Sequence, residues 1–165
     1  MKIGIISDSH DNLATLKKFT DYCIRENIKT VIHCGDVAEQ GTLKTLAENL
    51  DAEILLCLGN ADHDHRLAQT ADKTNGIRIF RSLGTAEIGG LKIGFVHYRE
   101  TALKFLGNER FDFIFYGHTH KPWMENVNGC VLANPGNLAG LLYKATFATL
   151  ETATRKLNLK IVDQL

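Results

Sequence analysis

The chain has 165 residues, of which 44% are hydrophobic and 23% charged, a composition typical of one globular domain of ordinary size. No stretch approaches the roughly 18 uninterrupted apolar residues that a membrane-spanning helix needs, so no membrane role is expected. Lysine plus arginine and aspartate plus glutamate number 19 each, and this balance argues against binding to nucleic acid or anionic lipid by net charge. We therefore expect a single domain over residues 1–165 that acts on a small substrate.

The N-terminus and the cysteines bear on the cellular compartment. The apolar run after Met1 ends at Asp8, which is too short for the core of a signal peptide, so we expect a cytoplasmic protein. The cysteines form no CxxC pair, and three of them sit in apolar periodic segments where a thiol behaves as a small hydrophobe. Reduced structural thiols are therefore expected at Cys23, Cys34, Cys57 and Cys130.

The first sixty residues alternate two patterns. Short apolar, β-branched runs occur at Ile3–Ile6, Val31–His33 and Ile54–Leu58, and they predict strands. Between them, apolar side chains recur every three or four residues from Leu13 to Cys23 and from Leu43 to Leu50, which predicts two helices with one buried face each. The order strand, helix, strand, helix, strand is typical of a parallel sheet.

From about Ile77 the sequence changes to short strands separated by glycine, with one helix expected from Glu100 to Leu106. An α/β half followed by a β-rich half predicts two sheets packed face to face, with helices on the outer surfaces. The segments that predict strands are GIRIF, TAEIG, LKIGFVH, FDFIFYG, CVLAN, ATFATLE and KLNLKIVD.

Five of the apolar runs end in residue types that bind metals. Asp8 and His10 follow the first run, and His118 and His120 repeat the same two-residue spacing after FDFIFYG. On an extended chain this step covers about 6.6 Å and turns both side chains to the same face. The other three runs end at Asp36, Asn60 and His97.

These seven side chains predict a metal centre. The carboxyl ends of neighbouring strands converge on one edge of an α/β sheet, so we expect the seven to face one small volume. Carboxylate, imidazole and amide ligands without thiolates suit manganese, iron or zinc, and seven of them suit two ions that share a carboxylate. Two ions about 3.5–4 Å apart can activate a water that bridges them and neutralise charge on a phosphate. The pattern therefore predicts hydrolysis of a phosphate ester.

The five motifs, in this order, resemble those of the calcineurin-like metallophosphoesterases, and most closely the small prokaryotic phosphodiesterases among them. The match runs from Lys2 to about Asn137, and the ordered set is far more specific than any single motif. The resemblance implies an α/β fold in which two mixed β-sheets pack as a sandwich flanked by helices, and it implies a homodimer or higher homo-oligomer. The motifs are Asp8-Ser9-His10, Gly35-Asp36, Gly59-Asn60, His97 and Gly117-His118-Thr119-His120.

The resemblance also assigns the ligands to two divalent ions per chain. We expect Mn²⁺ first, with Ni²⁺, Fe²⁺ or Zn²⁺ as alternatives, because this ligand set tolerates all four. The resemblance implies that Asp8, His10 and His120 bind one ion, that Asn60, His97 and His118 bind the other, and that Asp36 bridges both. Catalytic roles are expected for Asp36, Asn60 and His97, and substrate contacts for Asn12 and Asn60.

One departure from the family pattern concerns the leaving group. The family commonly has a histidine after the asparagine of the third motif, where it binds phosphate and can protonate the leaving oxygen, whereas this chain has Ala61. The proton must then come from water or from another residue such as His63 or His65, or the substrate must have a good leaving group. The missing histidine favours a diester.

Three further positions keep two interpretations each. Tyr98 replaces the glycine that usually follows the fourth motif, and it either packs at a strand end or offers its phenol to the substrate. Asn12 either caps the helix that begins at Leu13 or touches substrate. The segment from Asn134 to Asn137 resembles a closing Asn-Pro-Gly-Ser segment of the family, and it either forms a simple turn or supports the metal ligands from behind.

The predicted function is therefore a metal-dependent phosphodiesterase that hydrolyses a small phosphodiester by attack of a hydroxide bridging two divalent metals. A phosphomonoesterase acting on a nucleotide or a phosphoprotein is the nearest alternative. A non-catalytic protein-binding scaffold of the same fold is disfavoured because all seven ligands are present. A nuclease is disfavoured because the basic groupings at Lys17-Lys18 and around Arg110 are sparse.

Overall fold

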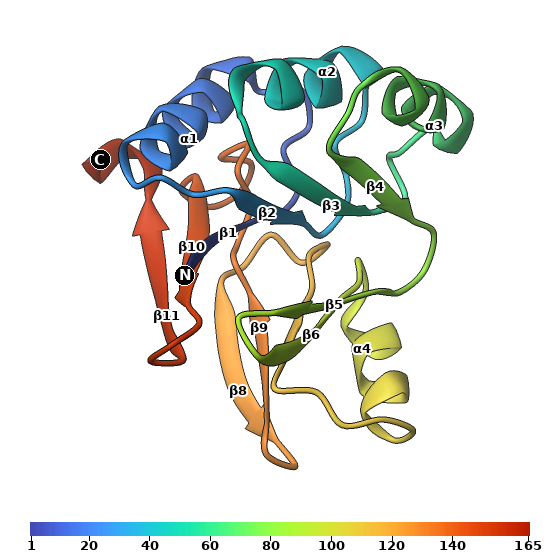
Figure 1. Cartoon of the computed structure of the whole chain (residues 1–165), viewed down its shortest axis with the longest axis vertical. Helices are drawn as coiled ribbons and strands as arrows, with labels where there is room; N and C mark the ends of the chain where they lie inside the picture. The colour runs from blue at the N-terminus through green and yellow to red at the C-terminus, as the bar shows by residue number, and fades with distance from the viewer.

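Two β-sheets pack face to face in the computed structural model, which describes residues 1–165 (Figure 1). The six-stranded sheet runs, in spatial order, β11 (Lys156–Ile161), β10 (Thr146–Glu151), β1 (Lys2–Ile6), β2 (Thr30–His33), β3 (Glu53–Cys57) and β4 (Ile77–Phe80). The five-stranded sheet runs β5 (Gly84–Ile88), β6 (Leu91–Phe95), β7 (Phe113–Phe115), β9 (Cys130–Asn134) and β8 (Trp123–Val127). Both sheets combine parallel and antiparallel pairs, so both are mixed.

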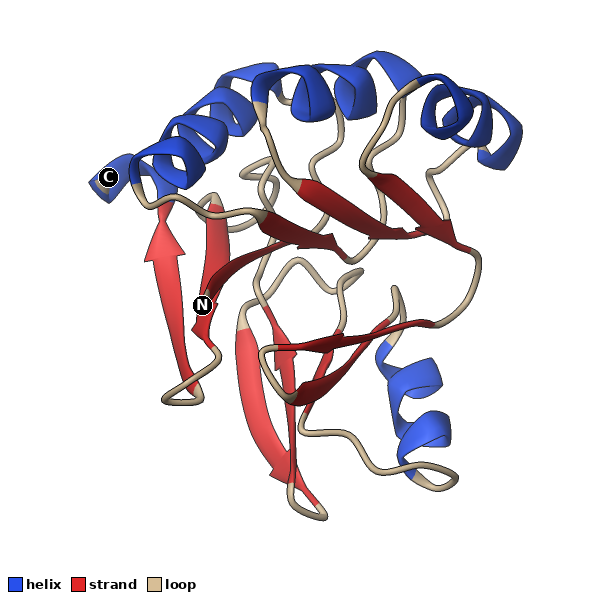
Figure 2. Ribbon diagram, viewed as in Figure 1, coloured by secondary structure: helices blue, strands red, loops and turns tan.

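Helices cover the outer faces of this sandwich (Figure 2). Three of them, α1 (Leu13–Arg25), α2 (Gln40–Asn49) and α3 (Asp64–Lys73), lie on the six-stranded sheet, and α4 (Arg99–Leu106) lies beside the five-stranded one. A short 3₁₀ helix, η1 (Val162–Gln164), follows β11. The predicted fold class, two mixed sheets flanked by helices, is confirmed.

The apolar core forms three layers between these elements. Phe19 and Leu43 pack between the helices and the first sheet, Ile5 and Phe95 pack between the two sheets, and Ile114 packs on the α4 side of the second sheet. In the first sheet β1, β2 and β3 are buried on both faces, which explains their unbroken apolar runs. The four cysteines lie unpaired in this interior, where burial raises the pKa of each thiol and keeps it protonated.

The two halves of the sequence do not correspond to the two sheets. β1 to β4 are parallel, but the first sheet also takes β10 and β11 from the end of the chain, with β10 antiparallel to β1. The sequence pattern predicts neither α3 nor β8. Only Leu67 of α3 is fully buried, so this helix has almost no apolar stripe, and β8 is an edge strand that exposes Trp123 and Met124.

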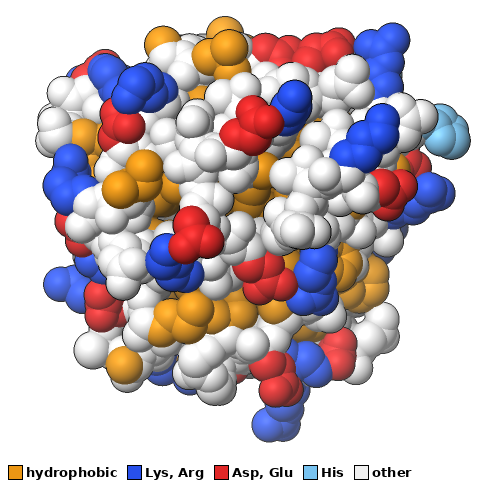
Figure 3. All heavy atoms as spheres, turned by 45° about the horizontal axis from the view of Figure 1, so that its top comes forward, with side chains coloured by type: hydrophobic (Ala, Val, Ile, Leu, Met, Phe, Trp, Pro, Cys, Tyr) orange, Lys and Arg blue, Asp and Glu red, His pale blue; other side chains and the backbone are white.

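The surface over the helices carries charges of both signs. Lysine and arginine side chains alternate with aspartate and glutamate on the face that Figure 3 shows, and ion pairs such as Lys17 with Asp21 and Lys29 with Asp51 neutralise them locally. This face therefore has no continuous basic groove. No helix of the structure has both the length and the apolar character that a membrane span requires.

Gly117 lies where the loop after β7 packs against the ends of β1 and β2. A Cβ at this position would collide with Ser7 Oγ and would lie 2.8 Å from Asp8 Oδ2 and 3.1 Å from Cys34 O. The loops from the ends of β1, β2 and β7 can therefore meet only over a glycine.

We predict that Gly117→Ala lowers the free energy of unfolding by about 1–3 kcal/mol, the usual cost of overpacking a buried site. Gly41→Ala is the matched control, because a Cβ there meets nothing within 4 Å and the residue lies inside α2. That change should stabilise the protein by about 0.5–1 kcal/mol. Urea denaturation with chelator present measures both, and equal stability of the two variants would contradict the close approach.

Candidate metal centre

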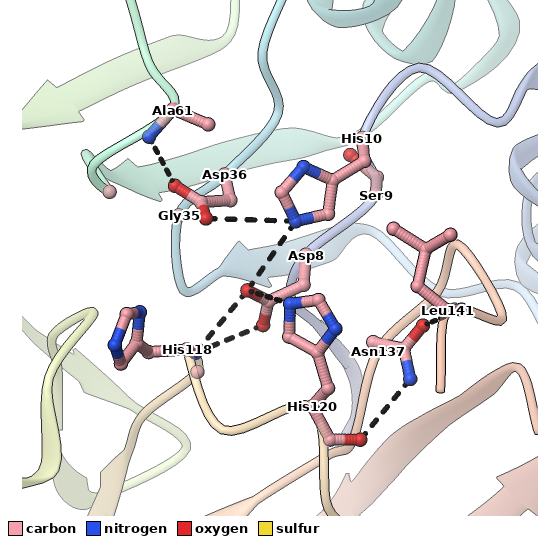
Figure 4. Close-up of polar contacts among 12 residues, drawn as sticks. Asp8, Ser9, His10, Gly35, Asp36, Ala61, His118, His120, Asn137 and Leu141 are labelled. Carbon is pink, nitrogen blue, oxygen red and sulfur yellow. Dashed lines mark hydrogen bonds and ion pairs between the residues drawn. The ribbon is translucent and has the colours of Figure 1, made fainter. Parts of the chain in front are cut away.

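The loops that follow five strands meet at one end of the sandwich. β1, β2 and β3 supply them from the first sheet, and β6 and β7 from the second. Backbone hydrogen bonds join the loops directly: Asp8 N donates to Gly35 O (2.9 Å), His10 N donates to Asp36 O (3.1 Å), and Gly117 N donates to His97 O (3.0 Å). Side chains far apart in the sequence are thereby held in one small volume (Figure 4).

Asp8 is the centre of the first group of side chains. Its carboxylate is fully buried, and its Oδ1 lies 3.3 Å from His120 Nε2 and 3.9 Å from His10 Nε2. The backbone N–H of His118 donates to Asp8 Oδ2 at 3.1 Å. The ligand atoms of Asp8, His10 and His120 all lie within 4.8 Å of one another, a spacing that one metal ion can span.

Asp36 connects this group to a second one. Its Oδ1 accepts a hydrogen bond from Ala61 N (2.8 Å), while its Oδ2 faces His10 Nε2 at 3.6 Å and His97 Nε2 at 3.5 Å. The ligand atoms of Asp8, Asp36 and His97 again lie within 4.8 Å of one another. Asp36 Oδ2 therefore lies between two imidazoles that the sequence assigns to different ions.

The hydrogen bonds of His97 determine which of its nitrogens is free. Nδ1 lies 2.8 Å from the carbonyl oxygen of Cys34, which can only accept, so Nδ1 carries the proton of the neutral ring. The lone pair of Nε2 then faces Asn60 Oδ1 at 3.1 Å and Asp36 Oδ2 at 3.5 Å. His97 Nε2, Asn60 Oδ1 and Asp36 Oδ2 are thus three acceptors that face one another, and only Asn60 Oδ1 receives a hydrogen bond there, from Tyr98 Oη. An outer hydrogen bond from Nδ1 to a carbonyl is the usual arrangement of a metal-binding histidine.

One buried nitrogen without a partner belongs to this group of ligand atoms. His10 Nε2, which faces Asp8 and Asp36, is buried and makes no hydrogen bond. An unpaired buried polar atom costs about 1–3 kcal/mol, so its position between two carboxylates calls for a ligand. Carboxylate oxygens and imidazole nitrogens are ligands that suit divalent cations of the manganese, iron or zinc kind.

Burial raises the pKa of Asp8 to about 6, because its carboxylate is desolvated and because the nearby charge of Asp36 acts in the same direction. The neighbouring imidazoles of His97 and His10 act in the opposite direction. A second negative charge so close is tolerated only when positive charge lies beside it. A divalent cation at this position would keep both carboxylates ionised.

The backbone under these side chains is left-handed. Positive φ occurs at Asp8 (51°), His10 (36°), Asp36 (58°), His118 (66°) and His120 (59°). The expectation that Asp8 and His10 share a face because the chain is extended is therefore wrong: the chain turns sharply there, and the turn itself brings the side chains together. Left-handed residues other than glycine are uncommon, and they cluster where a site over-determines the backbone.

The predicted residues do not all occupy equivalent positions. The imidazole of His118 is exposed and lies 5.1 Å from the His97 ring between centroids, and its backbone rather than its ring contacts Asp8. Asn12 caps α1, since its Oδ1 accepts from Thr15 N (3.3 Å), and its Nδ2 donates to Ala139 O (2.8 Å). The capping role is present, and contact of Asn12 with substrate stays a prediction.

Asp62 is the residue that the sequence analysis missed. Its carboxylate accepts three backbone hydrogen bonds, from Asp36 N (2.9 Å), Ala38 N (2.9 Å) and Gly59 N (2.8 Å). It therefore locks the loop after β2 to the loop after β3. The only signal in the sequence is an acidic residue two positions after Asn60 in a turn.

Two asparagines hold the loop after β7 from behind. Asn134 Nδ2 donates to Gly117 O (2.9 Å) and Thr119 Oγ1 (3.0 Å), and Asn137 Nδ2 donates to His120 O (3.1 Å). Figure 4 shows Asn137 beside His120, with the hydrogen bond to the His120 carbonyl oxygen as a dashed line. The segment from Asn134 to Asn137 is thus more than a turn, because it supports the backbone that presents His118 and His120.

The fold is an α/β sandwich of two mixed sheets, and its strand ends gather carboxylate and imidazole side chains that could hold a metal ion. The model of the calcineurin-like phosphoesterase superfamily domain matches residues 1–155. The chain belongs to this superfamily and is a hydrolase that acts on phosphate esters. The family resemblance stated from the motifs is confirmed.

Similar proteins agree with this assignment. The chain is 35% identical over 145 residues to a phosphodiesterase of Methanocaldococcus jannaschii, covering 86% of this chain and 87% of that protein. A solved structure of an archaeal phosphodiesterase matches with a TM-score of 0.89 at 32% identity, over 98% of this chain and 99% of the other. A phosphoesterase from E. coli, with 16% identity, 98% and 100% coverage and a TM-score of 0.68, shares the fold.

His33 lies beneath the centre and stays neutral. Gly35 N donates to His33 Nδ1 (3.2 Å), so the ring proton sits on Nε2, which faces Ser9 Oγ at 3.0 Å. Burial lowers the pKa of His33 to about 4. The carboxylate of Asp62 raises this pKa, and the nearby imidazoles of His97 and His10 lower it further. His33 therefore has a hydrogen-bonding role beneath the centre.

We predict that metal-free protein loses stability through His33 as the pH falls. A pKa that is lower in the folded state than its ordinary value of about 6.5 contributes stability above pH 6.5, and this stability is lost as the pH falls toward 4. Relative to His33→Asn, the wild type should lose up to about 3 kcal/mol more between pH 7 and pH 4. Asp8, whose pKa is raised, changes the stability in the opposite direction, but it does so equally in both proteins. Urea titrations at each pH give the free energy of unfolding, and parallel curves of this free energy against pH would refute the prediction.

Proposed function

We propose that this protein hydrolyses small phosphodiesters with two divalent ions, Mn²⁺ first among them. The observation that carries the proposal is the convergence of carboxylate and imidazole ligand atoms, with Asp8, Asp36 and His97 inside one 4.8 Å group and Asp8, His10 and His120 inside another. When bound, such ions would lower the pKa of a water between them and neutralise charge on the phosphate oxygens. The proposed ligands are Asp8, His10, Asp36, Asn60, His97, His118 and His120.

The protein side chains position this centre. Ala61 N binds Asp36 Oδ1 and leaves Oδ2 free to face the imidazoles. The carbonyl of Cys34 holds the His97 ring with Nε2 pointing to the same side. A site whose ligands are fixed in advance loses little free energy to reorganisation when substrate binds.

The choice of a diester substrate rests on the absence of a proton-donating side chain at position 61. Ala61 has no group that can protonate a leaving oxygen, and His63 and His65 are exposed at the start of α3. Tyr98 Oη is nearer, since it donates to Asn60 Oδ1 at 3.1 Å. A diester with a stable leaving oxygen needs less proton donation, and the similar protein from Methanocaldococcus jannaschii is named a phosphodiesterase.

We predict that chelator-treated protein regains hydrolysis of bis(p-nitrophenyl) phosphate when Mn²⁺ is added, and that Asp36→Asn lowers the restored rate at least about 100-fold. Asp72→Asn removes the same charge from an exposed position and should leave the rate unchanged. Hydrolysis of p-nitrophenyl phosphate alone would indicate a monoesterase, and no hydrolysis by the folded protein with any divalent ion would favour the binding scaffold.

The role of Asp62 gives a separate prediction. Asp62→Asn places an NH₂ group against backbone N–H donors, which should release the Asp36 loop and weaken Mn²⁺ binding by about 10–100-fold. Isothermal titration calorimetry measures this, with Asp72→Asn again as the control. An unchanged affinity in a folded Asp62→Asn protein would show that the loop needs no such support.

A further inference from the structure

A hollow in the surface lies next to the candidate metal centre. It has a volume of about 570 Å³ and is lined by Trp123 and Tyr143 together with Arg99, Thr119, Lys121 and Glu125. Thr119 stands between the proposed ligands His118 and His120 in the chain, so the hollow and the centre share one loop.

Hydrogen bonds fix both aromatic walls relative to that loop. Asn134, which donates to Thr119 Oγ1, pairs directly with Trp123 across β9 and β8. Asn137 donates to His120 O and accepts from Leu141 N at 2.7 Å, which ties down the segment that bears Tyr143 (Figure 4). The same two asparagines therefore hold the ligand loop and the walls of the hollow.

The charges in the hollow leave one cation without a partner. Arg99 is paired with Glu125, its Nη2 lying 2.7 Å from Oε1. Lys121 has no carboxylate within salt-bridge distance, and its Nζ lies 5.7 Å from the centroid of the Trp123 ring. The hollow thus has a net positive charge, which attracts an anionic ligand.

The aromatic rings indicate what else the ligand carries. Trp123 is 52% exposed and Tyr143 is 46% exposed, although both line a concave surface. Exposed aromatic faces beside an unpaired cation bind planar rings of anionic molecules by stacking, with little dependence on the identity of the base.

We propose that this hollow binds the nucleobase of a nucleotide phosphodiester whose phosphate lies at the metal centre. The nucleobase would stack on the aromatic walls, and Lys121 would face the phosphate-sugar portion. The inference rests on the proposed function for the position of the phosphate, and it makes nucleotide diesters the preferred substrates.

Trp123 is the only tryptophan of the chain, so its fluorescence reports on the hollow without any reaction. With Mn²⁺-loaded protein, adenosine 5′-monophosphate should quench the emission to saturation, and ribose 5-phosphate should not. Tyr143→Ala should raise the dissociation constant for the nucleotide about 10-fold. Leu142→Ala, a 90% exposed neighbour outside the hollow, should leave it unchanged.

A kinetic comparison tests the same inference with substrates that share a leaving group. Tyr143→Ala should raise KM for thymidine 5′-(p-nitrophenyl phosphate) about 10-fold and leave methyl p-nitrophenyl phosphate unaffected. If the wild type hydrolyses neither ester, the proposed function is wrong, whereas the fluorescence titration still shows whether the hollow binds a nucleotide. The inference is overturned if adenosine 5′-monophosphate does not quench Trp123, or if Tyr143→Ala raises KM equally for both esters. It is also overturned if Trp123 emission shifts with protein concentration alone, because that would indicate contact between copies of the chain.

Discussion

The structure depends on keeping two carboxylates, Asp8 and Asp36, buried at one point where five strand ends meet. Buried charges of the same sign are costly unless hydrogen bonds and opposite charge surround them. Backbone N–H groups of His118 and Ala61 supply part of this compensation. The imidazoles and, in our proposal, two divalent cations supply the rest. The left-handed backbone at Asp8 and Asp36, the crowded Gly59 and Gly117 beside their carboxylates, and the parallel order of β1, β2 and β3 all serve this one arrangement.

Rigidity in this site comes from outside the set of proposed ligands. Asp62 ties the loops after β2 and β3 together, and Asn134 and Asn137 tie the loop after β7 to the end of β9. Each of these side chains satisfies backbone groups that would otherwise be buried without partners. The ligand loops of each sheet are therefore fixed by side chains behind them, and Asn134 and Asn137 also contact the segments that line the aromatic hollow.

The sequence predicts the elements whose pattern is periodic. The apolar runs of β1, β2 and β3 and the stripes of α1 and α2 are visible because both depend on burial. The sequence does not predict α3 and β8, because their side chains are mostly exposed and their apolar residues therefore do not recur at a regular spacing.

The candidate site shows the same limit. Strand-end polar residues predict which side chains meet, because a parallel sheet brings those ends together. The positive φ at Asp8 and His10 follows from contacts with the loop after β2, and a local pattern does not contain them. The contact of Asp62 with three N–H groups and the presence of Tyr143 and Trp123 in one hollow depend on tertiary structure in the same way.

The most direct test of the two-ion centre is the anomalous X-ray diffraction of crystals grown with Mn²⁺. We expect two manganese peaks that both contact Asp36, one beside Asp8, His10 and His120 and the other beside Asn60, His97 and His118. A single peak, or peaks away from these side chains at saturating Mn²⁺, would contradict the account.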